Sequence, residues 1–66
     1  MPIIRVEMLE GRSIEQKREI AAVFTRELAR IAGCTEAGVT VVIDEHKKDN
    51  WAVGGTLMAD QIQDKK

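Results

Sequence analysis

The side chains that most often act as nucleophiles or metal ligands are scarce in this chain of 66 residues. Cys34 is the only cysteine and His46 the only histidine, and the two lie apart in the sequence. This pair predicts neither a metal site nor a Cys–His nucleophile. We interpret Cys34 as a packed or bystander thiol, which fits a reducing, cytoplasmic compartment. His46 has polar neighbours and is expected to be an exposed loop residue.

Pro2 and Arg12 are the other residues that could take part in a reaction, and the presence of each also has an ordinary structural explanation. Proline is tolerated at the start of a strand, where it need not donate to the ladder. A lone arginine after a glycine is most simply solvated or ion-paired. A free prolyl nitrogen would be a secondary amine and a competent general base. While Met1 is attached, however, the same nitrogen is an amide without a basic lone pair. Position alone favours the ordinary interpretations.

Composition and charge argue against several classes of partner. Ten basic and eleven acidic residues give a net charge of −1, with the signs interspersed, so nothing electrostatic favours nucleic acid. The longest apolar run is too short to cross a bilayer, and no signal-peptide pattern is present, so we expect no membrane association. Only Phe24 and Trp51 are aromatic, which gives poor support for stacking on bases or sugars.

Two main strands are predicted. The side chains of residues 3–9 alternate between the two faces of a strand, and both faces contain apolar residues. This pattern indicates a strand that is covered in part on both sides. Residues 39–43 are β-branched throughout, which is typical of a central or parallel strand. A turn at 35–38 leads into this second strand.

The segment between the two strands predicts a helix from Ile14 to Ala32. Ser13 is a good N-cap and Gln16 completes a capping box, while Gly33 is a plausible stop. At 100° per residue, one face collects the apolar side chains of Ile14, Ile20, Ala21, Phe24, Leu28, Ile31 and Ala32. The opposite face carries Glu19, Arg26, Glu27 and Arg30. Val23 falls among these polar residues, which suggests that the outer face also meets a partner.

The remaining residues predict a polar loop and a short strand. The loop covers 46–50, and residues 51–53 form a short strand ended by the glycine pair 54–55. The polar tail, 60–66, is expected to fray. With no linker or repeat, residues 1–66 form a single domain.

Strand, helix and strand in this length predict one βαβ unit, of class α/β (α+β in some schemes). The crossover should be right-handed and the two strands parallel. One helix on two strands leaves a sheet face or edge uncovered, and so small a chain has neither a disulfide nor a metal to stabilise it. We therefore expect a homo-oligomer in which a second subunit completes the sheet.

Four segments together resemble the 4-oxalocrotonate tautomerase family over essentially the whole chain. They are Met1-Pro2 before a strand, Leu9 to Ser13 leading into Glu15-Gln16-Lys17, Val41 to Glu45, and Trp51 to Gly55. The resemblance implies a βαβ unit with a short C-terminal hairpin, assembled as dimers and commonly as a hexamer. It also implies a cofactor-independent isomerase that acts on a small keto or enol acid.

The resemblance assigns roles to individual residues. The initiator methionine would be removed, leaving Pro2 as an N-terminal base whose pKa is lowered by burial and by nearby cations such as Arg12. Arg12 would hold a substrate carboxylate, and a guanidinium can do so with two hydrogen bonds. Trp51 would wall the site and exclude water, while packing at an interface is an equally good role for it.

Thr40 departs from the family pattern. Members that act on dicarboxylates carry a second arginine here, and threonine offers one neutral hydrogen bond but no charge. Arg5, Lys47 or Lys48 could supply a cation from elsewhere. A mono-acid enol such as an arylenolpyruvate therefore becomes an alternative to a 2-hydroxymuconate-like substrate.

Two other functions remain open. Relatives use a protonated terminal proline to hydrate or dehalogenate haloacrylates, which would need a group that activates water, with Glu7, Glu10 and Glu45 as candidates. The third possibility is a non-catalytic oligomer that binds a ligand or partner, favoured if Met1 is retained.

Overall fold

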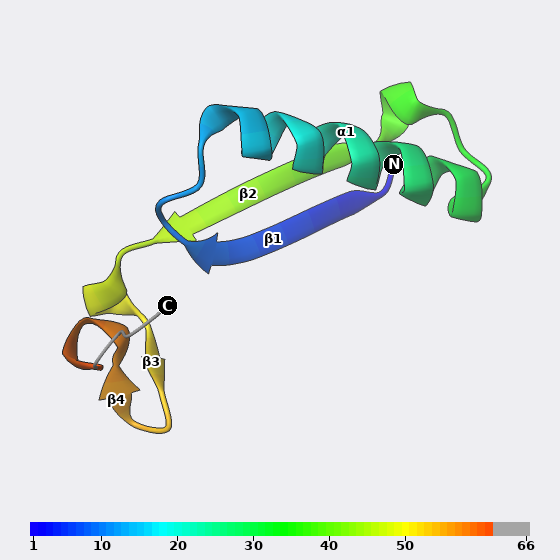
Figure 1. The fold of residues 1–66 in the computed structure, drawn as a ribbon. Helices are drawn as coiled ribbons and strands as arrows, with labels where there is room; N and C mark the ends of the chain where they lie inside the picture. The colour runs from blue at the N-terminus through cyan, green and yellow to red at the C-terminus, as the bar shows by residue number, and fades with distance from the viewer. Residues whose placement is uncertain (62–66) are drawn as a thin grey trace.

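A computed structural model describes residues 1–61, and a βαβ unit followed by a small hairpin makes up this part of the chain (Figure 1). The elements of the βαβ unit are β1 (Ile3–Leu9), α1 (Ile14–Ala32) and β2 (Thr40–His46), with a single 3₁₀ turn at Glu36–Gly38 before β2. Strands β1 and β2 run parallel, as predicted, and pair from Ile3 with Thr40 to Leu9 with His46.

Helix α1 begins and ends at the predicted residues. The Ser13 side chain accepts a hydrogen bond from the Gln16 backbone N–H at 3.1 Å, and the Gln16 side chain accepts one from the Ser13 N–H at 2.9 Å. These bonds close the predicted capping box. Gly33 ends the helix in the left-handed region, with φ 74°, where a side chain would be strained. These local signals are strong because each involves residues at most four positions apart.

Strand β2 is longer than the prediction of 39–43. It begins one residue later, at Thr40, and continues through Asp44 and Glu45 to His46. The two carboxylates are accommodated because each finds a cation. Arg5 on β1 bonds to Asp44 at 2.8 Å, and Lys17 on α1 bonds to Glu45 at 2.5 Å.

The second ion pair also orients the unit, since it places α1 over one face of the sheet. Parallel pairing puts Glu45 on the same face as Met8, and the alternating half-buried residues Ile4 and Val6 share that face. The opposite face carries Arg5 and the other exposed residues of β1. No element among residues 1–61 covers that face (Figure 1).

His46 corrects one prediction. It was expected in an exposed loop, but it is the last residue of β2, half-buried and paired with Leu9. Its backbone carbonyl also accepts a hydrogen bond from the Glu10 N–H at 2.9 Å. The loop starts only at Lys47 and includes a 3₁₀ turn at Lys48–Asn50.

The short hairpin lies beyond the carboxyl ends of β1 and β2 (Figure 1). It pairs β3 (Ala52–Val53) with β4 (Thr56–Leu57), so Trp51 precedes the predicted strand instead of starting it. Gly54 and Gly55 have φ values of 63° and 89°, the combination that a tight two-residue hairpin turn requires. A 3₁₀ turn follows at Met58–Asp60, so Asp60 does not begin a frayed tail, and 62–66 lie outside the described residues.

The core of the single chain is very small. Ala29 is the only buried apolar residue among those described, and Ile14, Phe24 and Ile31 of the predicted inner face are 55%, 42% and 71% exposed. The radius of gyration is 15.2 Å, against about 11 Å for a compact chain of this length. Within residues 1–61, no helix is both long and apolar enough to span a membrane.

Candidate active site

Pro2 lies at the amino end of β1, directly beside the start of β2. Its side chain is half-buried, and its carbonyl accepts a hydrogen bond from the Thr40 N–H at 3.0 Å. Met1 is 92% exposed and belongs to no strand. Loss of Met1 would therefore remove almost no packing, and the carbonyl bond to Thr40 would still anchor Pro2.

Arg12 lies at the other end of β1, in the connection to α1. Gly11 has a φ of 125°, which turns the chain back towards the helix and which a side chain would disfavour. Arg12 is exposed, and among residues 1–61 no ion pair joins it to a carboxylate. A guanidinium in this state has all its donors available for an anionic ligand.

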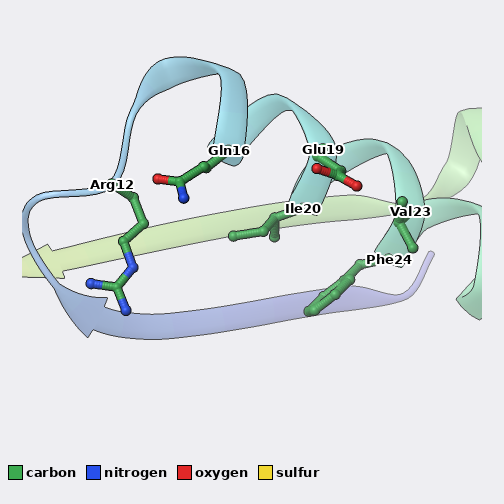
Figure 2. Close-up of a pocket in the computed structure, with 6 residues that line it drawn as sticks. All are labelled: Arg12, Gln16, Glu19, Ile20, Val23 and Phe24. Atoms are coloured by element: carbon green, nitrogen blue, oxygen red, sulfur yellow. The ribbon is translucent and has the colours of Figure 1, made fainter.

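A shallow groove of about 340 Å³ begins at Arg12 and follows one flank of α1 (Figure 2). It is lined by Arg12, Gln16, Glu19, Ile20, Val23 and Phe24. Arg12 occupies one end and Phe24 the other, with Ile20 between them (Figure 2). The groove therefore joins a free cation to an apolar strip that the single chain leaves open.

Trp51 lies at the carboxyl end of β2, where the chain leaves the βαβ unit. Its ring meets the His46 imidazole edge-on, with the ring centroids 5.7 Å apart and the planes at 61°. The two rings, with Glu7, Asn50 and Ala52, line a second hollow of about 250 Å³. The sequence did not predict that His46 lines this hollow. No local pattern placed His46 on a strand, because Asp44 and Glu45 interrupt the apolar run after Ile43.

The four predicted site residues form two separate groups in one chain. Pro2 and Thr40 lie at the amino end of the parallel strands, whereas Arg12 and Trp51 lie beyond their carboxyl ends. A strand of seven residues is about 23 Å long, so one chain cannot bring both groups to one small substrate.

The candidate replacements for a second arginine differ in their surroundings. Arg5 is held by Asp44, and the hydrogen bond and charge of that carboxylate raise the pKa of Arg5 above its ordinary value. Lys47 and Lys48 are exposed and line a third hollow of about 470 Å³ with Glu10, Asp49 and Ala59. None of the three cations is placed beside Pro2 within one chain.

The three glutamates considered as groups that activate water also lie in different surroundings. Glu45 is engaged by Lys17 between the helix and the sheet, Glu10 lies beside the two lysines, and Glu7 lies beside His46. Cys34, which follows α1, is exposed, so it is a bystander thiol and not a packed one.

Known proteins resemble this chain along nearly its whole length. A sequence model of the tautomerase enzyme family matches residues 2–61. A probable tautomerase from Staphylococcus epidermidis is 43% identical over 61 residues, which cover 92% of this chain and 100% of the relative. A 2-hydroxymuconate tautomerase from Bacillus subtilis is 40% identical over 60 residues, which cover 91% of this chain and 97% of the relative.

The fold agrees with a solved structure of the same kind. A heterohexamer 4-oxalocrotonate tautomerase from Chloroflexus aurantiacus matches with a TM-score of 0.86 and 40% identity, over 91% of this chain and 97% of that chain. The parallel βαβ unit with its C-terminal hairpin is thus shared, and the match of the family model begins at Pro2. This chain belongs to the tautomerase family.

Proposed function

We propose that this tautomerase moves a proton on an enol or unsaturated 2-oxo acid, with the nitrogen of Pro2 as the general base after Met1 has been removed. The observation that carries the proposal is the position of Pro2. It directly precedes β1, half-buried and anchored to Thr40 through its carbonyl, while Met1 projects into solvent. The reactive nitrogen would then be fixed by the sheet and exposed by a single cleavage.

The chemistry needs only one proton carrier. The neutral secondary amine accepts the proton of the enol hydroxyl, and the electron pair of the broken O–H bond forms the carbonyl. The conjugated electrons move to a carbon atom, which takes the proton back from the prolinium. Base and acid are the same atom, so the enzyme ends the cycle unchanged, and a transfer of this kind is worth about 10²–10⁴-fold in rate.

The separation of Pro2 from Arg12 supports a site shared between subunits. Because β1 holds the two residues about 23 Å apart, the Arg12 that binds the substrate carboxylate would come from a neighbouring copy. The exposed apolar strip that adjoins Arg12 in the groove would pack in the same contact. We propose a dimer-based homohexamer; the heterohexamer from Chloroflexus aurantiacus is a relative that assembles six chains of more than one kind.

Thr40 is relevant to the number of carboxylates on the proposed substrate. A 2-hydroxymuconate carries two carboxylates, and the relative from Bacillus subtilis is named for that substrate. In this chain the residue bonded to Pro2 is a neutral threonine, which is exposed and brings no charge. We therefore propose that a mono-acid enol, such as an arylenolpyruvate, is used at least as well as a dicarboxylate.

Ultraviolet assays of enol-to-keto conversion on the protein without Met1 test the proposal. Pro2→Ala and Arg12→Ala should each lower kcat/KM by roughly 100-fold or more. When the two variants are unfolded together and reassembled, about one quarter of the sites should regain both side chains if the site joins two copies. Parental rates in Pro2→Ala would overturn the assignment of the base, and a mixture as inactive as its components would overturn the shared site.

A hydratase or dehalogenase has no comparable support. The three candidate glutamates lie beside a lysine or a histidine, at the same end of the sheet as Arg12. No contact in the structure favours one of them as the group that activates water.

A further inference from the structure

The hollow where the sheet meets the hairpin contains a polar atom without a partner. The Nε2 atom of His46 is buried and has no hydrogen bond among residues 1–61. Its nearest acceptor is Oε1 of Glu7 on β1, at 3.8 Å, which is too long for a hydrogen bond. A buried polar atom in this state is unfavourable and calls for an explanation.

Glu7 can supply the missing bond. Its side chain is 59% exposed, so a small rotation can close the gap without moving the backbone. A carboxylate only accepts hydrogen bonds, so the bond forms when Nε2 carries a proton. If Nε2 lacks a proton, two acceptors face each other and the contact stays open.

Trp51 contacts the same imidazole from the root of the hairpin. The two ring planes meet at 61°, with the centroids 5.7 Å apart. Edge-to-face aromatic pairs prefer centroid separations of about 4.5–7 Å, so this contact is favourable in itself. His46 therefore joins Glu7 on β1 to Trp51 beside the hairpin.

The other charged groups of this region do not line the hollow. Asp44, two residues earlier on β2, is held by Arg5. Glu10, Lys47, Lys48 and Asp49 line the separate third hollow. Asn50 completes the lining beside His46 and carries no charge. Glu7 is the carboxylate among residues 1–61 that faces the imidazole.

Trp51 is the residue that this contact would control. It is half-buried between the end of β2 and β3, and its carbonyl accepts a hydrogen bond from the Met58 N–H at 2.7 Å. The backbone at Trp51 is thus hydrogen-bonded to the turn after the hairpin, while the ring contacts His46. The orientation of the indole depends on both contacts.

We propose that His46 is a positioning residue that holds the Trp51 indole against the end of the β1–β2 sheet, most firmly when its Nε2–H donates to Glu7. This inference rests on the proposed function in one respect, since Trp51 is taken as a wall of the substrate site. Tautomerase activity should then depend on His46 through KM, because the indole shapes binding and does not transfer the proton.

Fluorescence of Trp51 tests the contact without any substrate. Trp51 is the only tryptophan and the chain has no tyrosine, so the signal has one source. At one fixed pH, His46→Gln should move the emission maximum to longer wavelength, because loss of the imidazole exposes the indole to water. Glu7→Gln should give a smaller shift in the same direction, because an amide oxygen is a weaker acceptor than a carboxylate. Glu36→Gln, in the turn before β2, should leave the maximum unchanged.

Kinetics of two His46 variants separate positioning from simple packing. His46→Phe keeps a ring against Trp51 but has no donor, whereas His46→Gln keeps a neutral donor. The Phe variant should raise KM several-fold with kcat nearly unchanged, and the Gln variant should recover part of the loss. Far-ultraviolet circular dichroism and light scattering check that each variant folds and assembles.

Several outcomes would overturn the inference. They are a parental emission maximum in His46→Gln or in Glu7→Gln, or equal KM values in the Phe variant and the parent. Failure of the proposed function looks different. In that case the parent would have no activity that depends on Pro2, while the fluorescence of the parent and of the Glu7 variant would still behave as described.

Discussion

Thr40 lies directly beside the proposed base, where the resemblance to 4-oxalocrotonate tautomerases implies an arginine in members that act on dicarboxylates. Its backbone N–H bonds to the Pro2 carbonyl, while its side chain is exposed at the start of β2. A longer side chain can therefore be placed here without disturbing the core. At this position the charge of a single residue would select between substrates with one and two carboxylates.

Thr40→Arg should shift the substrate preference towards the dicarboxylate. A charge-assisted pair with the second carboxylate should raise kcat/KM for 2-hydroxymuconate by about tenfold, with little change for an arylenolpyruvate. Thr40→Met is the matched control, because it adds length without charge. Equal preference ratios in the Arg and Met variants would show that this position does not contact the second carboxylate.

Individual residues differed in how well the sequence could place them. Ser13, Gln16 and Gly33 were located correctly because their roles depend on near neighbours along the chain. The environment of His46 was not predicted correctly, because it depends on contacts with Glu7 and Trp51. These contacts form only when two strands and a hairpin meet. The roles of Pro2, Arg12, Thr40 and Trp51 came from resemblance and remain proposals.

At the scale of elements, the end of α1 matters because it determines where the chain turns towards β2. Gly33 has φ 74° and ψ 34°, and its N–H bonds to the Ala29 carbonyl at 3.0 Å. Space is not the constraint, since a Cβ atom at Gly33 would meet nothing within 4 Å. The requirement for glycine is therefore one of backbone conformation alone.

Gly33→Ala should lower the free energy of unfolding by about 1 kcal/mol, the typical strain of a left-handed backbone with a side chain. Gly38→Ala provides the control, because Gly38 lacks a positive φ and its added Cβ would lie 3.7 Å from the Thr35 hydroxyl, an ordinary contact. Urea denaturation at one fixed protein concentration measures both. A larger loss in Gly38→Ala than in Gly33→Ala would contradict this account.

The extent of β2 shows what a local pattern leaves out. The β-branched run predicted residues 39–43, but the strand continues to His46 because Arg5 and Lys17 neutralise Asp44 and Glu45. Those partners come from β1 and α1, at least 28 positions away along the chain. Strand ends that depend on such distant ion pairs are invisible to alternation and propensity.

At the scale of the whole molecule, the isolated chain leaves much of its apolar surface exposed. Phe24 and Ile31 belong to the apolar face that the sequence predicts for α1, yet both are exposed, and the molecule measures 43 × 24 × 15 Å. The periodicity identified a surface that needs cover, but it could not say that other copies would have to provide it. The extended shape and the divided site both call for the same solution, an oligomer.

The stability of such an oligomer should depend on protein concentration. The melting temperature should rise as the protein is concentrated, because association stabilises the folded chains. Phe24→Arg should yield smaller species in light scattering, since it places a charge in the apolar strip of the groove. Arg18→Glu, on an exposed helix position outside the groove lining, should keep the parental mass. A parental mass in Phe24→Arg would place the interface elsewhere.

The central claim concerns one nitrogen atom, and total chemical synthesis can test it directly because the chain has only 66 residues. Two versions would be made, one beginning at Met1 and one at Pro2, and both would be refolded and matched by circular dichroism and light scattering. The measurement is kcat/KM for enol-to-keto conversion of an arylenolpyruvate. We predict that the chain beginning at Pro2 is at least roughly 100-fold more active, because only its prolyl nitrogen has a basic lone pair. Equal activity in the two chains would contradict the account.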